Sequence, residues 1–84
     1  MLRVLFFGRF REELDCAELN LVFSENYTNL QGLQDALIAE RGGQWLEVLA
    51  QENVIRAVNQ EVATQNVALF DGDEIAFFPP VTGG

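Results

Sequence analysis

The alternation of apolar and polar residues predicts two strands in the first quarter of the chain. Leu2–Gly8 is rich in Val, Leu and Phe, with Arg3 as its only charge, which is typical of a strand buried in a sheet. In Ala17–Phe23, apolar residues recur at every second position, which indicates a strand with one face inward. The polar segment Arg9–Leu14 between them favours a short helical turn.

The middle of the chain has the period of an amphipathic helix. Thr28 and Gln31 match a capping box, which predicts Thr28 as the N-cap and a helix that begins at Asn29. Arg41 followed by two glycines predicts that this helix ends near Arg41. Its apolar stripe falls at i, i+3, i+7 and i+8, and consists of Leu30, Leu33, Leu37 and Ile38.

The remaining residues predict a second, shorter helix and more strands. Residues 45–49 suggest a short helix at the edge of the core, and Val54–Val58 is expected to be the third strand. Asn59-Gln60 is the expected turn, and Val62 begins a short return segment. Asp71-Gly72-Asp73 is a tight-turn sequence.

The last strand and the order of the elements predict the fold class. Glu74–Phe78 is a strand that Pro79 ends, because proline cannot donate to a sheet. The order β-β-α-β-β, with apolar first and last strands, predicts an α+β fold of the β-grasp, ubiquitin-like type. We expect a mixed sheet of four to five strands crossed by one main helix. Residues 1–78 would form this domain and residues 79–84 an extended tail.

The same alternation predicts an apolar patch on the open face of the sheet. Arg3 and Glu74 mark the solvent-facing side of the first and last strands, and side chains two and four positions later share that side. The patch would comprise Leu5, Phe7, Ala76 and Phe78. One helix cannot cover both faces, so the patch is expected to bind a partner, unless the second helix or a loop covers it. Arg9 and Arg11 would steer that docking by charge.

Composition narrows the classes of function. With 84 residues the chain is expected to be one domain, and its net charge of −8 argues against nucleic-acid binding and for an electropositive protein partner. No apolar run reaches the roughly 18 residues of a membrane span, and a signal peptide is not evident, so a cytoplasmic protein is expected. Histidine is absent, which argues against intrinsic catalysis and against a metal site. Cys16 is expected to be a half-buried structural residue, with a persulfide carrier as the alternative.

The final six residues, Pro79-Pro80-Val81-Thr82-Gly83-Gly84, predict chemistry at the end of the chain. Two prolines project the following residues away from the sheet, and an extended segment of this length reaches roughly 20 Å. Gly83 and Gly84 have no Cβ, so they pass a narrow channel and leave the terminal carbonyl carbon open to a nucleophile. The alternative is a frayed terminus of no function.

Three motifs give the chain a specific resemblance. They are Val4-Leu5-Phe6-Phe7-Gly8 with Arg11-Glu12, Ala57-Val58-Asn59-Gln60-Glu61, and above all Asp71-Gly72-Asp73-Glu74-Ile75-Ala76-Phe77-Phe78-Pro79-Pro80-Val81-Thr82-Gly83-Gly84. The chain resembles the small, sulfur-carrier subunits of molybdopterin synthase, which are ubiquitin-like β-grasp proteins. The resemblance in length and strand order extends over the whole chain, while residues 15–53 contribute little to it.

The resemblance implies a non-catalytic carrier that binds no cofactor itself. An E1-like adenylyltransferase would use ATP and Mg²⁺ to adenylate the Gly84 carboxylate, and a persulfide donor would convert it to a thiocarboxylate. The thiocarboxylate would donate its sulfur to the cyclic pyranopterin precursor in the large subunit of the synthase, where the dithiolene is built. Two carriers on a dimeric large subunit, a heterotetramer, would be the assembly.

The resemblance also implies which residues contact the partners. Phe7, Val62 and Phe78 would make apolar contacts, Arg11 a polar contact, and Pro79, Pro80, Val81, Thr82 and Gly83 would form the inserted tail. Phe7 and Phe78 also follow from the apolar patch. A β-grasp sulfur carrier of thiamin synthesis, a ubiquitin-like protein modifier and an inert interaction module remain as alternative functions.

Overall fold

A computed structural model describes residues 1–80 of the chain. Its secondary structure comprises five strands, three α-helices and one 3-10 helix, η1. In chain order they are β1 Leu2–Phe6, α1 Arg9–Glu13, β2 Glu18–Leu21, η1 Glu25–Tyr27, α2 Leu30–Arg41, α3 Gly43–Leu49, β3 Ile55–Val58, β4 Glu61–Val62 and β5 Glu74–Phe78.

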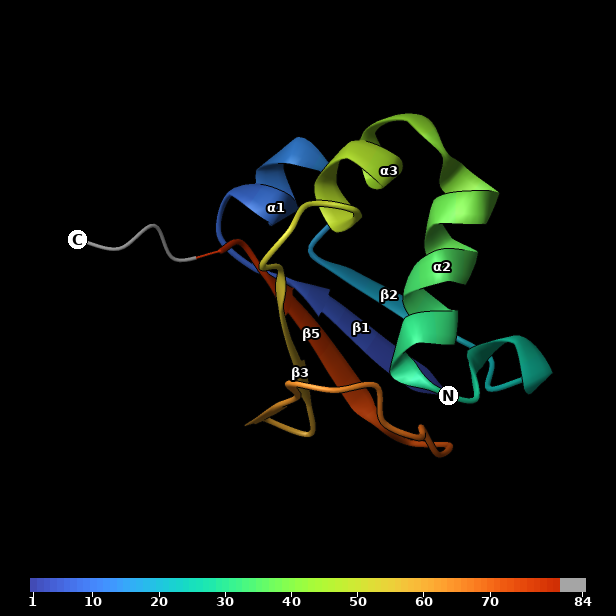
Figure 1. The fold of residues 1–84 in the computed structure, drawn as a ribbon. Helices are drawn as coiled ribbons and strands as arrows, with labels where there is room; N and C mark the ends of the chain where they lie inside the picture. The colour runs from blue at the N-terminus through green and yellow to red at the C-terminus, as the bar shows by residue number, and fades with distance from the viewer. Residues whose placement is uncertain (81–84) are drawn as a thin grey trace.

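The strands form one mixed sheet in the order β2-β1-β5-β3-β4. The first and last strands, β1 and β5, are parallel neighbours at its centre, and every other pair is antiparallel. Figure 1 shows the main helix α2 crossing the sheet, with α3 beside it on the same side. This is the β-grasp fold expected from the sequence, with its first and last strands side by side.

The core lies between the sheet and the helices. Alternate residues of β1 and β5 meet the predicted stripe of α2, of which Leu30, Leu33 and Leu37 are fully buried. Phe6 packs against both the sheet and the helices. Its ring centroid lies 5.7 Å from that of Phe77 in a stacked pair and 5.2 Å from that of Trp45 in an edge-on pair. Such aromatic contacts add stability beyond their buried area.

Two predictions about the helices are wrong in detail. The N-cap of α2 is Asn29 and not Thr28, because the Asn29 side chain accepts the hydrogen bond from Gly32 N at 2.7 Å. The Thr28 carbonyl accepts a hydrogen bond from Leu69 N instead. The segment predicted to be polar, now α1, also buries Phe10 completely in the core. Among residues 1–80, no helix has the length and apolar character needed to span a membrane.

The turn between β3 and β4 fixes the edge of the sheet to the start of β5. Asn59 and Gln60 both have positive φ, 51° and 70°, which is the requirement of a two-residue hairpin turn of type I′. The Asn59 side chain accepts a hydrogen bond from Glu74 N and donates one to Asp73 Oδ1, each at 3.0 Å. Asn59 therefore holds the predicted hairpin turn against the predicted Asp-Gly-Asp turn.

Replacement of Asn59 will test this connection. We expect Asn59→Ala to lower the free energy of unfolding by about 2 kcal/mol. The change removes two hydrogen bonds, and alanine tolerates positive φ less well than asparagine, whose side chain can form local hydrogen bonds. Asn59→Gly removes the same bonds without the backbone strain and should cost about half as much. Denaturant titration measures both variants, and equal losses would show that backbone strain contributes nothing.

Candidate functional site

The open face of the sheet, opposite the helices, carries a hollow of about 350 Å³ next to the end of β5. We call it the open-face hollow. Its lining residues are Leu5, Phe7, Ala57, Gln60, Val62, Glu74, Ala76 and Phe78. The fold thus brings together Phe7, Val62 and Phe78, the three apolar contact residues predicted from the sequence.

The register of the sheet explains why this face is hollow. Ala76 of β5 pairs with Leu5 of β1 on one side and with Ala57 of β3 on the other, and Ala57 pairs in turn with Val62 of β4. These four residues form one row across four strands, with two small alanines between two larger side chains. The alanines make the floor, and Leu5 and Val62 make the walls.

Two stacked phenylalanines close the end of the hollow nearest the tail. The Phe7 and Phe78 rings lie 4.7 Å apart at 6° and so are nearly parallel. The pair is positioned by the backbone, because Phe7 N donates a hydrogen bond to Phe77 O at 3.1 Å. Phe7 is 37% exposed and Val62 is 66% exposed, so large apolar side chains on both sides of the hollow reach solvent. Exposed apolar clusters of this kind are typical of surfaces that bind a partner.

The predicted patch is on the expected face, but one of its members is not exposed. Ala76 is only 7% exposed, because flanking strands cover a short side chain in the centre of the sheet. The alternative, that the second helix or a loop covers the patch, is wrong for residues 1–80, because Phe7 and Val62 reach solvent there. Helix α3 packs on the core side, where Val48 and Leu49 are buried and Trp45 meets Phe6.

The tail begins directly beside this hollow. Pro79 and Pro80 follow β5 and are half-buried, and Pro79 lies against Gly8 at the end of β1. The predicted contact residues Val81, Thr82 and Gly83, and the predicted reactive residue Gly84, lie outside the described residues. Their roles stay predictions from the sequence.

Arg3 lies on the open face, whereas Arg9 and Arg11 lie on α1. At the end away from the tail, Arg3 pairs with Glu18 at 3.1 Å and with Glu74 at 3.4 Å, which makes that end polar. Arg11 is exposed on α1 and does not line the open-face hollow. Arg9 contacts Gln51 at 3.4 Å and Glu13 at 3.9 Å. Their proposed part in charge steering stays a prediction.

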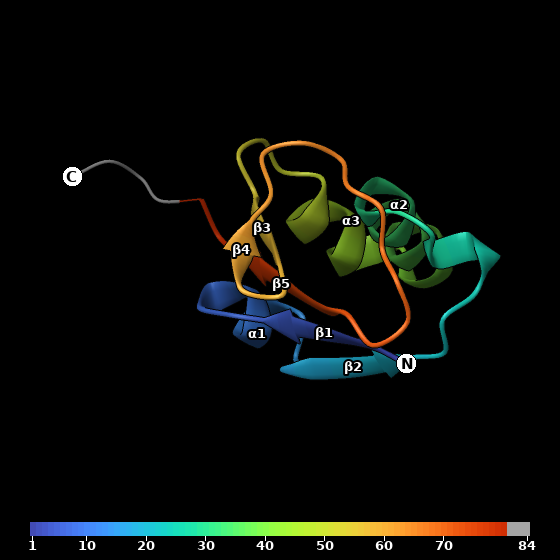
Figure 2. The ribbon, with the colours of Figure 1, turned by 90° about the horizontal axis from the view of Figure 1, so that it is seen from below.

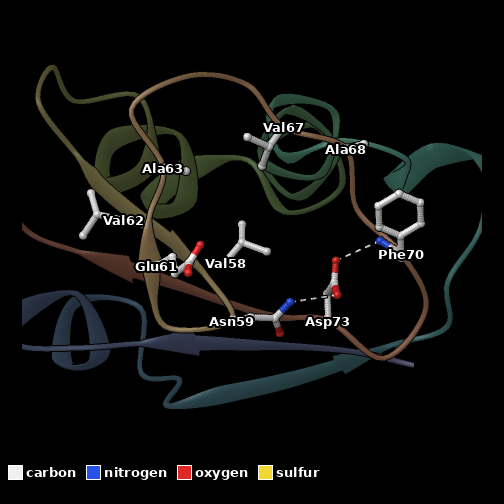
Figure 3. Close-up of a pocket in the computed structure, with 9 residues that line it drawn as sticks. All are labelled: Val58, Asn59, Glu61, Val62, Ala63, Val67, Ala68, Phe70 and Asp73. Atoms are coloured by element: carbon white, nitrogen blue, oxygen red, sulfur yellow. Dashed lines mark hydrogen bonds between the residues drawn. The ribbon is translucent and has the colours of Figure 1, made fainter.

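A second hollow, of about 440 Å³, lies between the β3–β4 hairpin and the loop that leads to β5. Figure 3 shows Asp73 on its wall with both carboxylate oxygens engaged, one by Asn59 Nδ2 at 3.0 Å and one by Phe70 N at 2.8 Å. Its other walls carry the exposed Glu61 and otherwise apolar side chains: Val58, Val62, Ala63, Val67, Ala68 and Phe70. Asp73 is therefore engaged in the turn before β5, and Glu61 is the other carboxylate that lines this hollow.

Other candidate chemistry is limited to structural roles among residues 1–80. No cluster of three or more potential metal-binding side chains is found there. Cys16 is a half-buried free thiol, as expected for a structural residue, and its Sγ donates a hydrogen bond to Glu18 O at 3.5 Å. The described part of the chain therefore offers an exposed apolar hollow and, beside it, the two prolines that follow β5.

Comparison with known proteins assigns the family. The ThiS family matches residues 4–84, which is nearly the whole chain. The chain belongs to the ThiS family. A protein of Haemophilus influenzae named molybdopterin synthase sulfur carrier subunit is 37% identical over 84 residues, which cover 100% of both chains.

Solved structures agree with the fold. A Haloferax volcanii protein solved in solution is 26% identical with a TM-score of 0.77, over 99% of this chain and 85% of that one. A chain from the complex of subunits 1 and 2 of molybdopterin-converting factor of Helicobacter pylori is 29% identical. Its TM-score is 0.63, over 99% of this chain and 97% of that one.

Sequence reasoning missed three features of the site. Ala57 and Gln60 line the open-face hollow, and Gly8 supports the root of the tail. The alternation in β3 could have placed Ala57 on the open face, because Val58 is its inward neighbour. Nothing in the local sequence reports that Gly8 meets Pro79, which is far away along the chain.

The Arg3–Glu18 pair predicts a pH dependence of stability. Its hydrogen bond, aided by a second one from Asn20, lowers the pKa of Glu18 from its ordinary value. A lowered carboxyl pKa stabilises the fold above the unfolded value of about 4.3, and this contribution is lost as the pH falls through the folded pKa. We expect Glu18→Gln to be less stable than wild type at pH 6, with the difference vanishing near pH 2.

The control for this titration is Glu47→Gln. Glu47 is exposed on α3 and has no ion pair within residues 1–80, so its replacement should leave the pH profile of stability unchanged. Thermal unfolding at several pH values measures both variants. A Glu18→Gln profile parallel to that of wild type would contradict the role of the pair.

Proposed function

We propose that this chain is the sulfur carrier subunit of a molybdopterin synthase. The observation that carries the proposal is the 37% identity, over the entire length of both chains, with the Haemophilus influenzae protein of that name. The placement of the tail root beside an open apolar hollow supports it, because a carrier needs a docking face from which its reactive end extends. The chain's own lack of histidine fits a subunit whose partners supply the catalytic groups.

The chemistry begins with activation of a poor electrophile. In the proposed reaction, the Gly84 carboxylate attacks the α-phosphorus of Mg²⁺-bound ATP in an E1-like adenylyltransferase, and pyrophosphate leaves. The terminal sulfur of a persulfide donor then attacks the acyl carbon and displaces AMP. A thiol cleaves the remaining S–S bond and leaves the thiocarboxylate on Gly84. The activating enzyme uses the ATP and Mg²⁺, and this chain holds no cofactor of its own.

The second half of the cycle takes place in the large subunit. The tail, residues 79–84, enters its active site and the thiocarboxylate sulfur is transferred to the cyclic pyranopterin precursor. The open-face hollow accepts an apolar side chain of the partner, and burial of Phe7, Val62 and Phe78 would provide much of the affinity. The net charge of −8 favours an electropositive partner surface.

The similar Helicobacter pylori chain belongs to a complex of two subunits, which supports a heteromeric assembly. Two carriers on a dimeric large subunit, a polar contact by Arg11 and a cytoplasmic location stay predictions.

Mass spectrometry tests the proposed function directly. The chain produced together with its activating enzyme and a persulfide donor should gain a mass equal to the replacement of one oxygen by sulfur, located on Gly84. A chain without the activating enzyme is the control. An unchanged C-terminus in the complete system would sink the proposal. Transfer of the sulfur to a thiazole precursor, or attachment of the chain to lysines, would assign it to one of the alternative functions.

The docking face has a separate test. We expect Val62→Glu to weaken binding to the large subunit by about tenfold or more, because it places a charge on the wall of the open-face hollow. The matched control is Val22→Glu: Val22 is 71% exposed, close to the 66% of Val62, and lies outside the hollow. Both changes should alter the free energy of unfolding by less than about 0.5 kcal/mol. Equal affinities of the two variants in calorimetry would contradict the assignment of this face.

A further inference from the structure

Gly8 lies at the junction of β1 and α1, and it meets the first residue of the tail. Its backbone has φ 60° and ψ −141°, a conformation that essentially only glycine adopts without strain. A Cβ placed on Gly8 would lie 3.1 Å from Cγ and 3.4 Å from Cδ of Pro79. The first of these distances is shorter than an ordinary contact between side chains, so the Pro79 ring would have to move.

The surroundings of Gly8 hold the two segments in one arrangement. On one side, Phe7 stacks on Phe78 and its N–H donates to Phe77 O. On the other side, the Gly8 carbonyl accepts a hydrogen bond from Arg11 N at 3.2 Å, which begins α1. The segment around Gly8 is therefore tied both to the end of β5 and to α1. The backbone at Gly8 is therefore held in place where the Pro79 ring contacts it.

We propose that Gly8 is a positioning residue for the tail. Its bare face seats the Pro79 ring and thereby sets the direction in which the chain leaves β5 beside the open-face hollow. Proline adds to this effect, because its fixed φ leaves little freedom at the first tail residue. This inference rests on the proposed function, since the direction of the tail matters only if partner enzymes receive its end while they hold the docking face.

The chain contains a matched control for this contact. Gly42, between α2 and α3, has φ 57° and ψ −160°, close to the conformation of Gly8, but a Cβ there would meet nothing within 4 Å. Alanine therefore imposes similar backbone strain at both positions and touches the tail root only at Gly8. We expect both variants to fold, with Tm values lowered by a similar amount, on the order of 5 °C.

The experiment compares Gly8→Ala and Gly42→Ala in two ways. The ¹³C chemical shifts of the Pro79 ring should change in Gly8→Ala and not in Gly42→Ala. The kcat/KM of Gly84 thiocarboxylation should fall about tenfold in Gly8→Ala. It is measured with a limiting amount of activating enzyme, saturating ATP and persulfide donor, and varied concentrations of this chain. It should stay within twofold of wild type in Gly42→Ala. Pro79→Ala removes the ring and leaves Gly8 in place, so it should also lower kcat/KM, and the double variant Gly8→Ala with Pro79→Ala should lose no more than Pro79→Ala alone.

The outcomes separate this inference from the proposed function. Equal Pro79 shifts and equal kcat/KM values in the two glycine variants would overturn the role of Gly8. Independent losses in the double variant would overturn it as well. If Gly8→Ala failed to fold, a Pro79→Ala variant with the kcat/KM of wild type would overturn the role of the Gly8–Pro79 contact. A wild-type chain that gains no sulfur would refute the proposed function instead, while the ring shifts would still decide whether Gly8 seats Pro79.

Discussion

The parallel pairing of β1 with β5 is the constraint on which the other features depend. It joins the two ends of the domain at the centre of the sheet, with Leu5 opposite Ala76 and Phe6 opposite Phe77. Inward, the pairing stacks Phe6 on Phe77 within the core. Outward, it lays Phe7 beside Phe78 where the tail begins. Parallel neighbours need a long crossover connection, and here the helices and outer strands of the middle of the chain provide it. Stability of the core and the geometry of the docking face therefore come from the same pairing.

The two faces of the sheet differ because the helical layer is large enough to cover only one of them. Helices α2 and α3 cover one face, as the second view of the ribbon in Figure 2 also shows, and the opposite face is left to its own side chains. At one end Arg3 and its two carboxylate partners make that face polar. Towards the tail the row of Leu5, Ala76, Ala57 and Val62 makes it apolar and concave. The apolar part of this face thus lies at the end of β5 where Pro79 begins.

Periodicity predicted the faces of the strands well, because a strand has only two sides. The positions of Phe7 and Phe78 were accessible in this way. The stripe of α2 followed from the helical period, and the tight turn before β5 from its Asp-Gly-Asp sequence. The burial of individual side chains was not predictable from periodicity. Ala76, for example, is covered by strands that pair with it from distant parts of the chain. The prediction of Thr28 as the cap of α2 was wrong for the same reason. Thr28 and Asn29 are both good caps, and the loop before β5 decides between them: Leu69 N binds the Thr28 carbonyl, and Ala68 pairs with Asn29.

The contact between Gly8 and Pro79 represents the kind of information that local sequence lacks. A glycine after a strand predicts only a change of direction, and a proline after a strand predicts only its end. The two residues come into contact because parallel pairing brings the ends of β1 and β5 to the same edge of the sheet. There, a residue without a side chain is needed where the backbone turns into α1 at positive φ, and the same absence of a Cβ leaves room for the proline ring. One glycine thus satisfies a turn and a tertiary contact at once, which links the start of the domain to the root of its tail.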